Sequence, residues 1–169
     1  MKKTISTLLT GVTLLLSGCM GYHLEGSKPQ AVKTVFVQPI INQTDEPAVE
    51  IQLTQALRKQ LQFDGRFRLA NTADQADALI ATRVTDFEIH SVGFDSDHTT
   101  RPDQYRITLR AKTQLLHATT QKVLKTSQTY GDTTFRFRSD LTTTKRDALP
   151  RASADLARFI VDDLAETWQ

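Results

Sequence analysis

A strict alternation of apolar and polar side chains over residues 104–118 constrains the fold of this chain more than any other feature. Side chains of a strand point to opposite faces in turn, so the pattern predicts a long strand with one face in a core and the other in water. The apolar phase comprises Tyr105, Ile107, Leu109, Ala111 and Leu115. The polar phase comprises Arg106, Thr108, Arg110, Lys112 and Gln114.

A second long strand is predicted before this one, over residues 78–92. Its apolar side chains keep one phase at Ile80 and Val84 and then change phase at Phe87 and Ile89. Such a change indicates a β-bulge within one strand, or else two shorter strands.

Turns connect these segments into an antiparallel meander. Residues 93–103 are polar and are expected to form a protruding hairpin loop, and residues 119–121 the next turn. A third strand is expected over residues 122–137, with an interruption near Gly131 and Asp132.

Two amphipathic helices accompany the strands. The first is expected over residues 47–63, with Thr44 or Asp45 as its N-terminal cap and Gly65 just beyond its end. The second follows a polar linker and places Pro150 in its first turn or at a kink. Its apolar residues recur at three- and four-residue spacing: Leu149, Ala152, Leu156, Phe159, Ile160, Leu164 and Trp168.

Two shorter strands complete the pattern, over residues 32–41, where Pro39 marks an edge or an end, and over residues 66–70. The order is β-α-β-β-β-β-α, and each helix has a single apolar stripe. We therefore predict one α+β domain over residues 32–169, a two-layer sandwich. Both helices pack on one face of a mainly antiparallel sheet of four to five strands.

The leader, residues 1–18, begins with Lys2 and Lys3, and its apolar run is too short to span a membrane. It ends in Leu16-Ser17-Gly18-Cys19, a lipobox pattern. We expect cleavage before Cys19, acylation of that cysteine and a tether over residues 19–31. Met20 rather than Asp after the cysteine favours sorting to the outer membrane. The alternatives are an ordinary signal peptide or an uncleaved anchor.

Composition excludes several functions. The chain has 21 basic and 19 acidic side chains, and two of the basic ones lie in the leader, so the mature chain is balanced and no nucleic-acid partner is expected. Cys19 is the only cysteine, which leaves no disulfide, Cys-ligated metal or thiol nucleophile. The four histidines lack zinc-site spacing, and no nucleophile elbow or P-loop is present. We expect no enzyme, metal or cofactor.

The polar face of the sheet is the most informative surface. Arg106, Arg110 and Lys112 share a side of one strand, Lys125 lines up beside them in one possible register, and Arg136 belongs to another alternating pair. These cations either form the water-exposed face of the sheet, where charges discourage edge pairing, or bind phosphate and sugar groups. In the second case, the expected ligand is a phosphorylated glycolipid.

Several segments resemble one family. Cys19-Met20-Gly21-Tyr22-His23-Leu24 is similar, apart from an inserted Met20, to the start of the lipopolysaccharide-assembly lipoproteins of the LptE family. Residues 37–47 with Glu50, residues 64–66 and residues 76–78 resemble later segments of the same family.

The resemblance implies a two-helix α+β lipoprotein at the inner leaflet of the outer membrane. Members plug the lumen of the β-barrel lipopolysaccharide (LPS) translocon, support its assembly, and bind LPS during delivery to the outer leaflet. Face geometry, not a family motif, selects the candidate contacts with the barrel or LPS: Arg106, Arg110, Lys112, Lys125 and Arg136. The rival functions are regulation of a periplasmic peptidoglycan synthase and carriage of a soluble ligand, which requires a deep apolar cavity.

Overall fold

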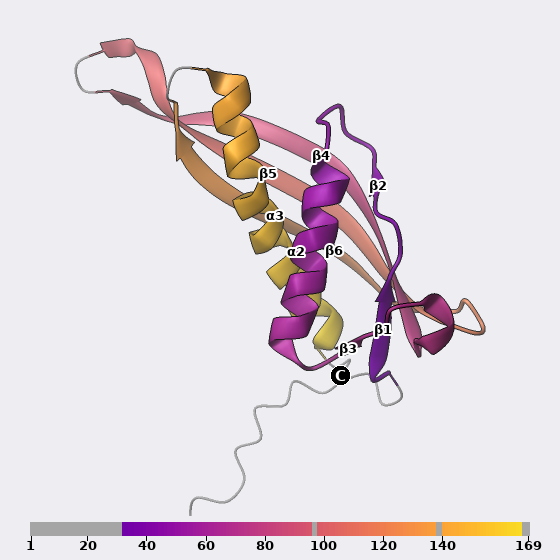
Figure 1. Ribbon diagram of the computed structural model, residues 1–169. Helices are drawn as coiled ribbons and strands as arrows, with labels where there is room; N and C mark the ends of the chain where they lie inside the picture. The colour runs from indigo at the N-terminus through magenta and orange to yellow at the C-terminus, as the bar shows by residue number, and fades with distance from the viewer. Residues whose placement is uncertain (1–31, 96–97, 138–139, 167–169) are drawn as a thin grey trace, which may run out of the picture.

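A computed structural model describes residues 32–95, 98–137 and 140–166. The predicted signal peptide, Cys19, the tether and Trp168 lie outside these residues. Figure 1 shows helices α2 (Val49–Asp64) and α3 (Leu141–Ala165) side by side on one face of a twisted sheet. The predicted two-layer α+β architecture is confirmed.

The sheet has six strands in the order β3-β1-β4-β5-β6, and β2 also pairs with β4. Strand β1 runs parallel to β3 and β4, whereas β4, β5 and β6 form the predicted antiparallel meander. The predicted first strand is split at Pro39 into β1 and β2. The strands are β1 (Thr34–Val37), β2 (Ile41–Asn42), β3 (Arg68–Leu69), β4 (Ala78–Asp95), β5 (His98–His117) and β6 (Val123–Arg136).

The long β4–β5 hairpin both confirms and corrects the sequence-based predictions. Its register shifts between Val84 and Asp86, which confirms the bulge. The predicted loop over residues 93–103 is wrong, because β4 continues to Asp95 and β5 begins at His98. Backbone pairing does not need apolar side chains, so a polar segment extends the ladder beyond the core. Figure 1 shows this hairpin projecting past the helices.

The core lies between the helices and the apolar phase of the long strands, as predicted. Each helix contributes a stripe of fully buried side chains, and the sheet contributes its facing residues. From α2 and α3 these include Leu53, Leu57, Leu61, Leu156, Ile160 and Leu164; from the sheet they include Ile80, Ile107, Leu109 and Leu115.

The start of α2 is organised differently from the prediction. Ala48 occupies the N-terminal cap position with φ +66° and makes no side-chain cap bond. Instead, the Asn42 side chain accepts from the Thr44 N–H (3.0 Å) and donates to the Glu46 carbonyl oxygen (2.8 Å). Gly65 ends the helix in the left-handed conformation, as predicted.

Helix α3 begins earlier than expected, within the predicted linker. Asp140 caps it by accepting from the backbone N–H groups of Thr142 (3.3 Å) and Thr143 (2.7 Å). Pro150 therefore lies inside the helix, not in its first turn. Phe159, predicted in the core, is 38% exposed.

Asp77 ties the start of β4 to the start of β1. Its Oδ2 accepts from Thr34 Oγ1 (2.6 Å) and from the N–H groups of Thr34 (2.8 Å) and Lys33 (2.9 Å). These bonds, with that from the Thr34 hydroxyl first, hold the pKa of Asp77 below its ordinary value of 3.8.

This clamp predicts an acid dependence of stability. A carboxyl with a lowered native pKa stabilises the fold above its unfolded pKa, and the contribution is lost as pH falls through the native value. We expect Asp77→Asn to lower the free energy of unfolding by about 1 kcal/mol at pH 7, a small value because the group is exposed. In urea titrations, the stability difference between the variant and the parent should shrink as the pH falls below the ordinary carboxyl pKa of 3.8. Equal stability of the two at pH 7 would contradict the clamp.

Candidate functional site

The candidate site is the open face of the sheet, opposite the helices. It carries the polar phase of β5 flanked by the corresponding residues of β4 and β6. Lys112 lies between Arg83 and Gln128, and Arg110 lies between Asp86 and Tyr130. Further along, Arg106 lies between His90 and Thr134, and Arg136 lies opposite Gln104. The structure thus places four of the five predicted contact residues on one face: Arg106, Arg110, Lys112 and Arg136.

Part of this charge is neutralised within the face. Arg110 lies 3.5 Å from an oxygen of Asp86 and 3.6 Å from one of Glu88, and Arg106 lies 3.2 Å from Asp132. A hydrogen bond with His90 lowers the pKa of Glu88, and the nearby Arg110 guanidinium acts in the same direction. These carboxylates orient the two arginines.

The remaining cations are not neutralised. Arg83 and Lys112 lie directly opposite each other on neighbouring strands and, like Arg136, make no ion pair with any described residue. Like charges in this position destabilise a sheet. Across the paired parts of β4, β5 and β6, this face carries five basic and three acidic side chains, so it attracts anions.

Two depressions flank Lys112. One, of about 290 Å³, is lined by Thr85, Arg110, Ala111, Lys112, Gln128, Thr129 and Tyr130. The other, of about 100 Å³, is lined by Gln38, Pro39, Ile41, Ala81, Thr82, Arg83, Lys112 and Gln114. Charged and hydrogen-bonding side chains beside one exposed Tyr ring suit a phosphorylated, hydroxyl-rich ligand. Neither is the deep apolar cavity that a carrier of apolar ligands requires.

Lys125 is not part of this face. It pairs in register with Leu115, in the apolar phase, and is 9% exposed. Its ammonium group donates to the Asp163 carbonyl oxygen and lies 3.4 Å from that residue's carboxylate. The prediction that Lys125 lies beside the other cations is therefore wrong.

Sequence reasoning missed Arg83 and Tyr130. Arg83 lies in the polar phase of residues 78–92, next to Val84, and this alternation could have placed it on the open face. Its position opposite Lys112, however, depends on the register of β4 with β5. Tyr130 gave no comparable signal, because aromatic residues are common in either phase of a strand.

The sequence profile that describes the LptE lipopolysaccharide-assembly family matches residues 32–164. The chain belongs to the LptE family. The match covers the whole described fold up to the last turn of α3. A search of curated protein sequences finds no significant match.

Solved structures share the fold of this LptE-family chain. A Caulobacter crescentus protein is 20% identical, with a TM-score of 0.53 over 75% of this chain and 88% of that one. A minor lipoprotein from Acinetobacter baumannii is 14% identical, with a TM-score of 0.51 over 79% and 92%. PelC from Paraburkholderia phytofirmans, solved as a dodecamer, is 16% identical, with a TM-score of 0.51 over 84% and 95%. Identities this low show a common fold alone.

Within the described residues, no helix is both long and apolar enough to cross a membrane. The same part of the chain holds no group of three or more His, Cys, Asp or Glu side chains placed to bind a metal ion.

Proposed function

We propose that this LptE-family chain is an outer-membrane lipoprotein, acylated at Cys19. It acts without catalysis, plugs and supports assembly of the β-barrel LPS translocon, and binds LPS on its way to the outer leaflet. The observation that carries the LPS role is the pair of unneutralised cations, Arg83 and Lys112, which line the depressions of the open face.

The chemistry of this face supports a phosphorylated glycolipid. Guanidinium forks bind phosphate through two parallel hydrogen bonds, and a Lys ammonium adds a compact charge. Arg110 lies over the Tyr130 ring, with its guanidinium carbon 5.9 Å from the ring centroid, which holds it at the rim of the depression. A polar face of this kind also suits a plug in a polar barrel lumen. No observation favours regulation of a peptidoglycan synthase.

Charge reversal tests the binding role. The double variant Arg83→Glu with Lys112→Glu breaks no ion pair among the described residues, so we expect it to fold. We expect its affinity for immobilised LPS to fall at least about tenfold, because two attractive charges become repulsive. Arg58→Glu with Lys59→Glu, on the exposed side of α2, makes the same change in net charge and serves as the control. Equal binding by both double variants would remove the open face from this role.

Isolation from membranes tests the plug. The acylated wild-type protein should co-purify with an outer-membrane β-barrel in mild detergent. Recovery only with a cell-wall synthase would contradict the proposal.

A further inference from the structure

Among the described residues, no strand pairs with the outer edge of β6. β6 is the last strand in the sheet order. The Phe137 N–H donates to the Asp103 carbonyl oxygen (2.7 Å), so the backbone groups of odd-numbered residues of this segment face β5. Those of even-numbered residues therefore face outward. Asp132 agrees, because its N–H donates to Asp155 Oδ2 on α3 (3.1 Å).

The bond from the Asp132 N–H to Asp155 blocks the middle of the β6 edge, and the part of the edge that precedes Asp132 stays open. Between the register shift near Leu116 and the closed point at Asp132, the outward residues are Thr126, Gln128 and Tyr130. All three are exposed, and their outward N–H and C=O groups bond no described residue. An unpaired stretch of this kind is a template for an added strand.

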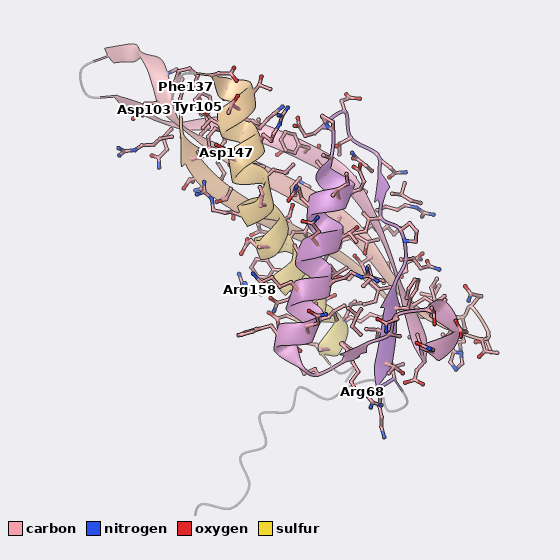
Figure 2. The ribbon with its side chains drawn as sticks, in the orientation of Figure 1. Arg68, Asp103, Tyr105, Phe137, Asp147 and Arg158 are labelled. Atoms are coloured by element: carbon pink, nitrogen blue, oxygen red, sulfur yellow. The ribbon has the colours of Figure 1, made fainter. Side chains whose placement is uncertain are left out.

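A groove of about 270 Å³ lies between this open edge and the end of α3. It is lined by Gln128, Thr129, Tyr130, Phe159, Asp162, Asp163 and Glu166. The Tyr130 and Phe159 rings stack with centroids 6.2 Å apart and are 56% and 38% exposed. Figure 2 shows Arg158, the neighbour of Phe159, on the flank of α3 away from α2.

The charge of the groove is opposite to that of the open face. Three carboxylates line it and no basic side chain does. Asp162 and Asp163 are each paired from behind, with Arg66 and Lys125, whereas Glu166 makes no ion pair with any described residue. Each ring already has a cation over it. The guanidinium carbon of Arg158 lies 4.2 Å from the Phe159 ring centroid, and that of Arg110 lies 5.9 Å from the Tyr130 centroid. Glu166 is therefore the group that is left to bind a Lys or Arg side chain of a partner by an ionic contact.

We propose that the groove docks an extended segment of a partner protein that adds a strand to β6 and places a Lys or Arg beside Glu166. Resting on the proposed function, the inference assigns this segment to the barrel protein, as a loop or terminus, because a closed barrel wall has no free strand edge. β6 then separates two ligands: the anionic glycolipid on its cationic side and the protein segment at its anionic edge.

Proline substitution tests the added strand. Gln128→Pro removes an outward N–H but no ladder bond to β5. Thr134→Pro makes the same change beyond Asp132, outside the groove, and serves as the matched control. We expect Gln128→Pro to lower the amount of co-purifying barrel at least about tenfold, and Thr134→Pro to leave it unchanged. Cooperative thermal unfolding checks that each variant is folded.

A charge variant supplies an independent test that does not alter the backbone. Glu166→Lys should lower barrel recovery several-fold, while binding of immobilised LPS stays within about twofold of the wild type. If the wild type captures barrel and Gln128→Pro and Glu166→Lys capture as much, the groove proposal is overturned and the plug remains. If the wild type captures no barrel, both proposals fail.

Discussion

Gly131→Ala is expected to destabilise the domain by about 3 kcal/mol or more. A Cβ at this position would lie 2.1 Å from the Leu156 backbone nitrogen and 2.5 Å from its Cα. Both are backbone atoms inside a helix, so no side-chain rotation relieves the clash. α3 must move away from β6 instead, and this opens the packed interface on both sides of Leu156.

The other described glycines provide graded controls. At Gly93 the nearest atom to a new Cβ is the flexible Gln104 side chain, at 3.1 Å, so alanine there should cost little. At Gly65 there is open space but φ is +74°, so alanine should cost about 1 kcal/mol of backbone strain. In urea unfolding, the loss of stability should be largest for Gly131→Ala, smaller for Gly65→Ala and smallest for Gly93→Ala. The melting temperature of Gly131→Ala should be roughly 10 °C below that of the wild type. A Gly131→Ala protein as stable as Gly93→Ala would show that α3 does not lie this close.

Lys125→Glu is expected to cost roughly 3–5 kcal/mol, because it places a carboxylate against Asp163 in a nearly closed site. The side chain of Lys125 is 10% exposed and that of Asp163 is 35% exposed. Lys125→Met keeps the length of the side chain and removes the charge. Because Asp163 retains access to water, we expect this variant to lie within about 1 kcal/mol of the wild type.

Lys122→Glu is the control for charge alone, since Lys122 is exposed and lies immediately before β6. Denaturant titrations of the three variants should show a large loss only for Lys125→Glu. A large loss for Lys125→Met as well would mean that the ion pair itself, not the avoidance of repulsion, stabilises the end of α3. LPS binding by the folded Lys125→Met variant should match the wild type, because Lys125 lies behind the sheet.

The sequence predicts which side chains of a strand are buried where the apolar and polar phases are clearly different. In β5 the two phases differ sharply, and the predicted face of Arg106, Arg110 and Lys112 is correct. In β6 both phases are polar, and the buried phase contains Lys125, Ser127 and Thr129. Alternation carries no information there, and the position of α3 decides which phase is buried.

The register between strands and the hydrogen bonds of the turn before α2 could not be predicted from the sequence either. The bulge near Val84 changes which β4 residue meets Arg110, so the pairing of Arg83 with Lys112 follows only from three-dimensional structure. Side-chain bonds from Asn42 organise the turn before α2, and the expected side-chain cap of the helix does not form. The part of the hairpin beyond Val92 has no alternation of apolar residues from which a strand could be predicted.

The long strands of that hairpin determine how far the domain can extend from a membrane surface. β5 contains 20 residues, which at about 3.3 Å per residue give roughly 65 Å. A bilayer with its headgroups is about 40–45 Å thick. Figure 1 shows the end of β4 and the beginning of β5 at the opposite end of the domain from β1. With the proposed anchoring at Cys19 on one membrane surface, β5 is long enough to extend to the other.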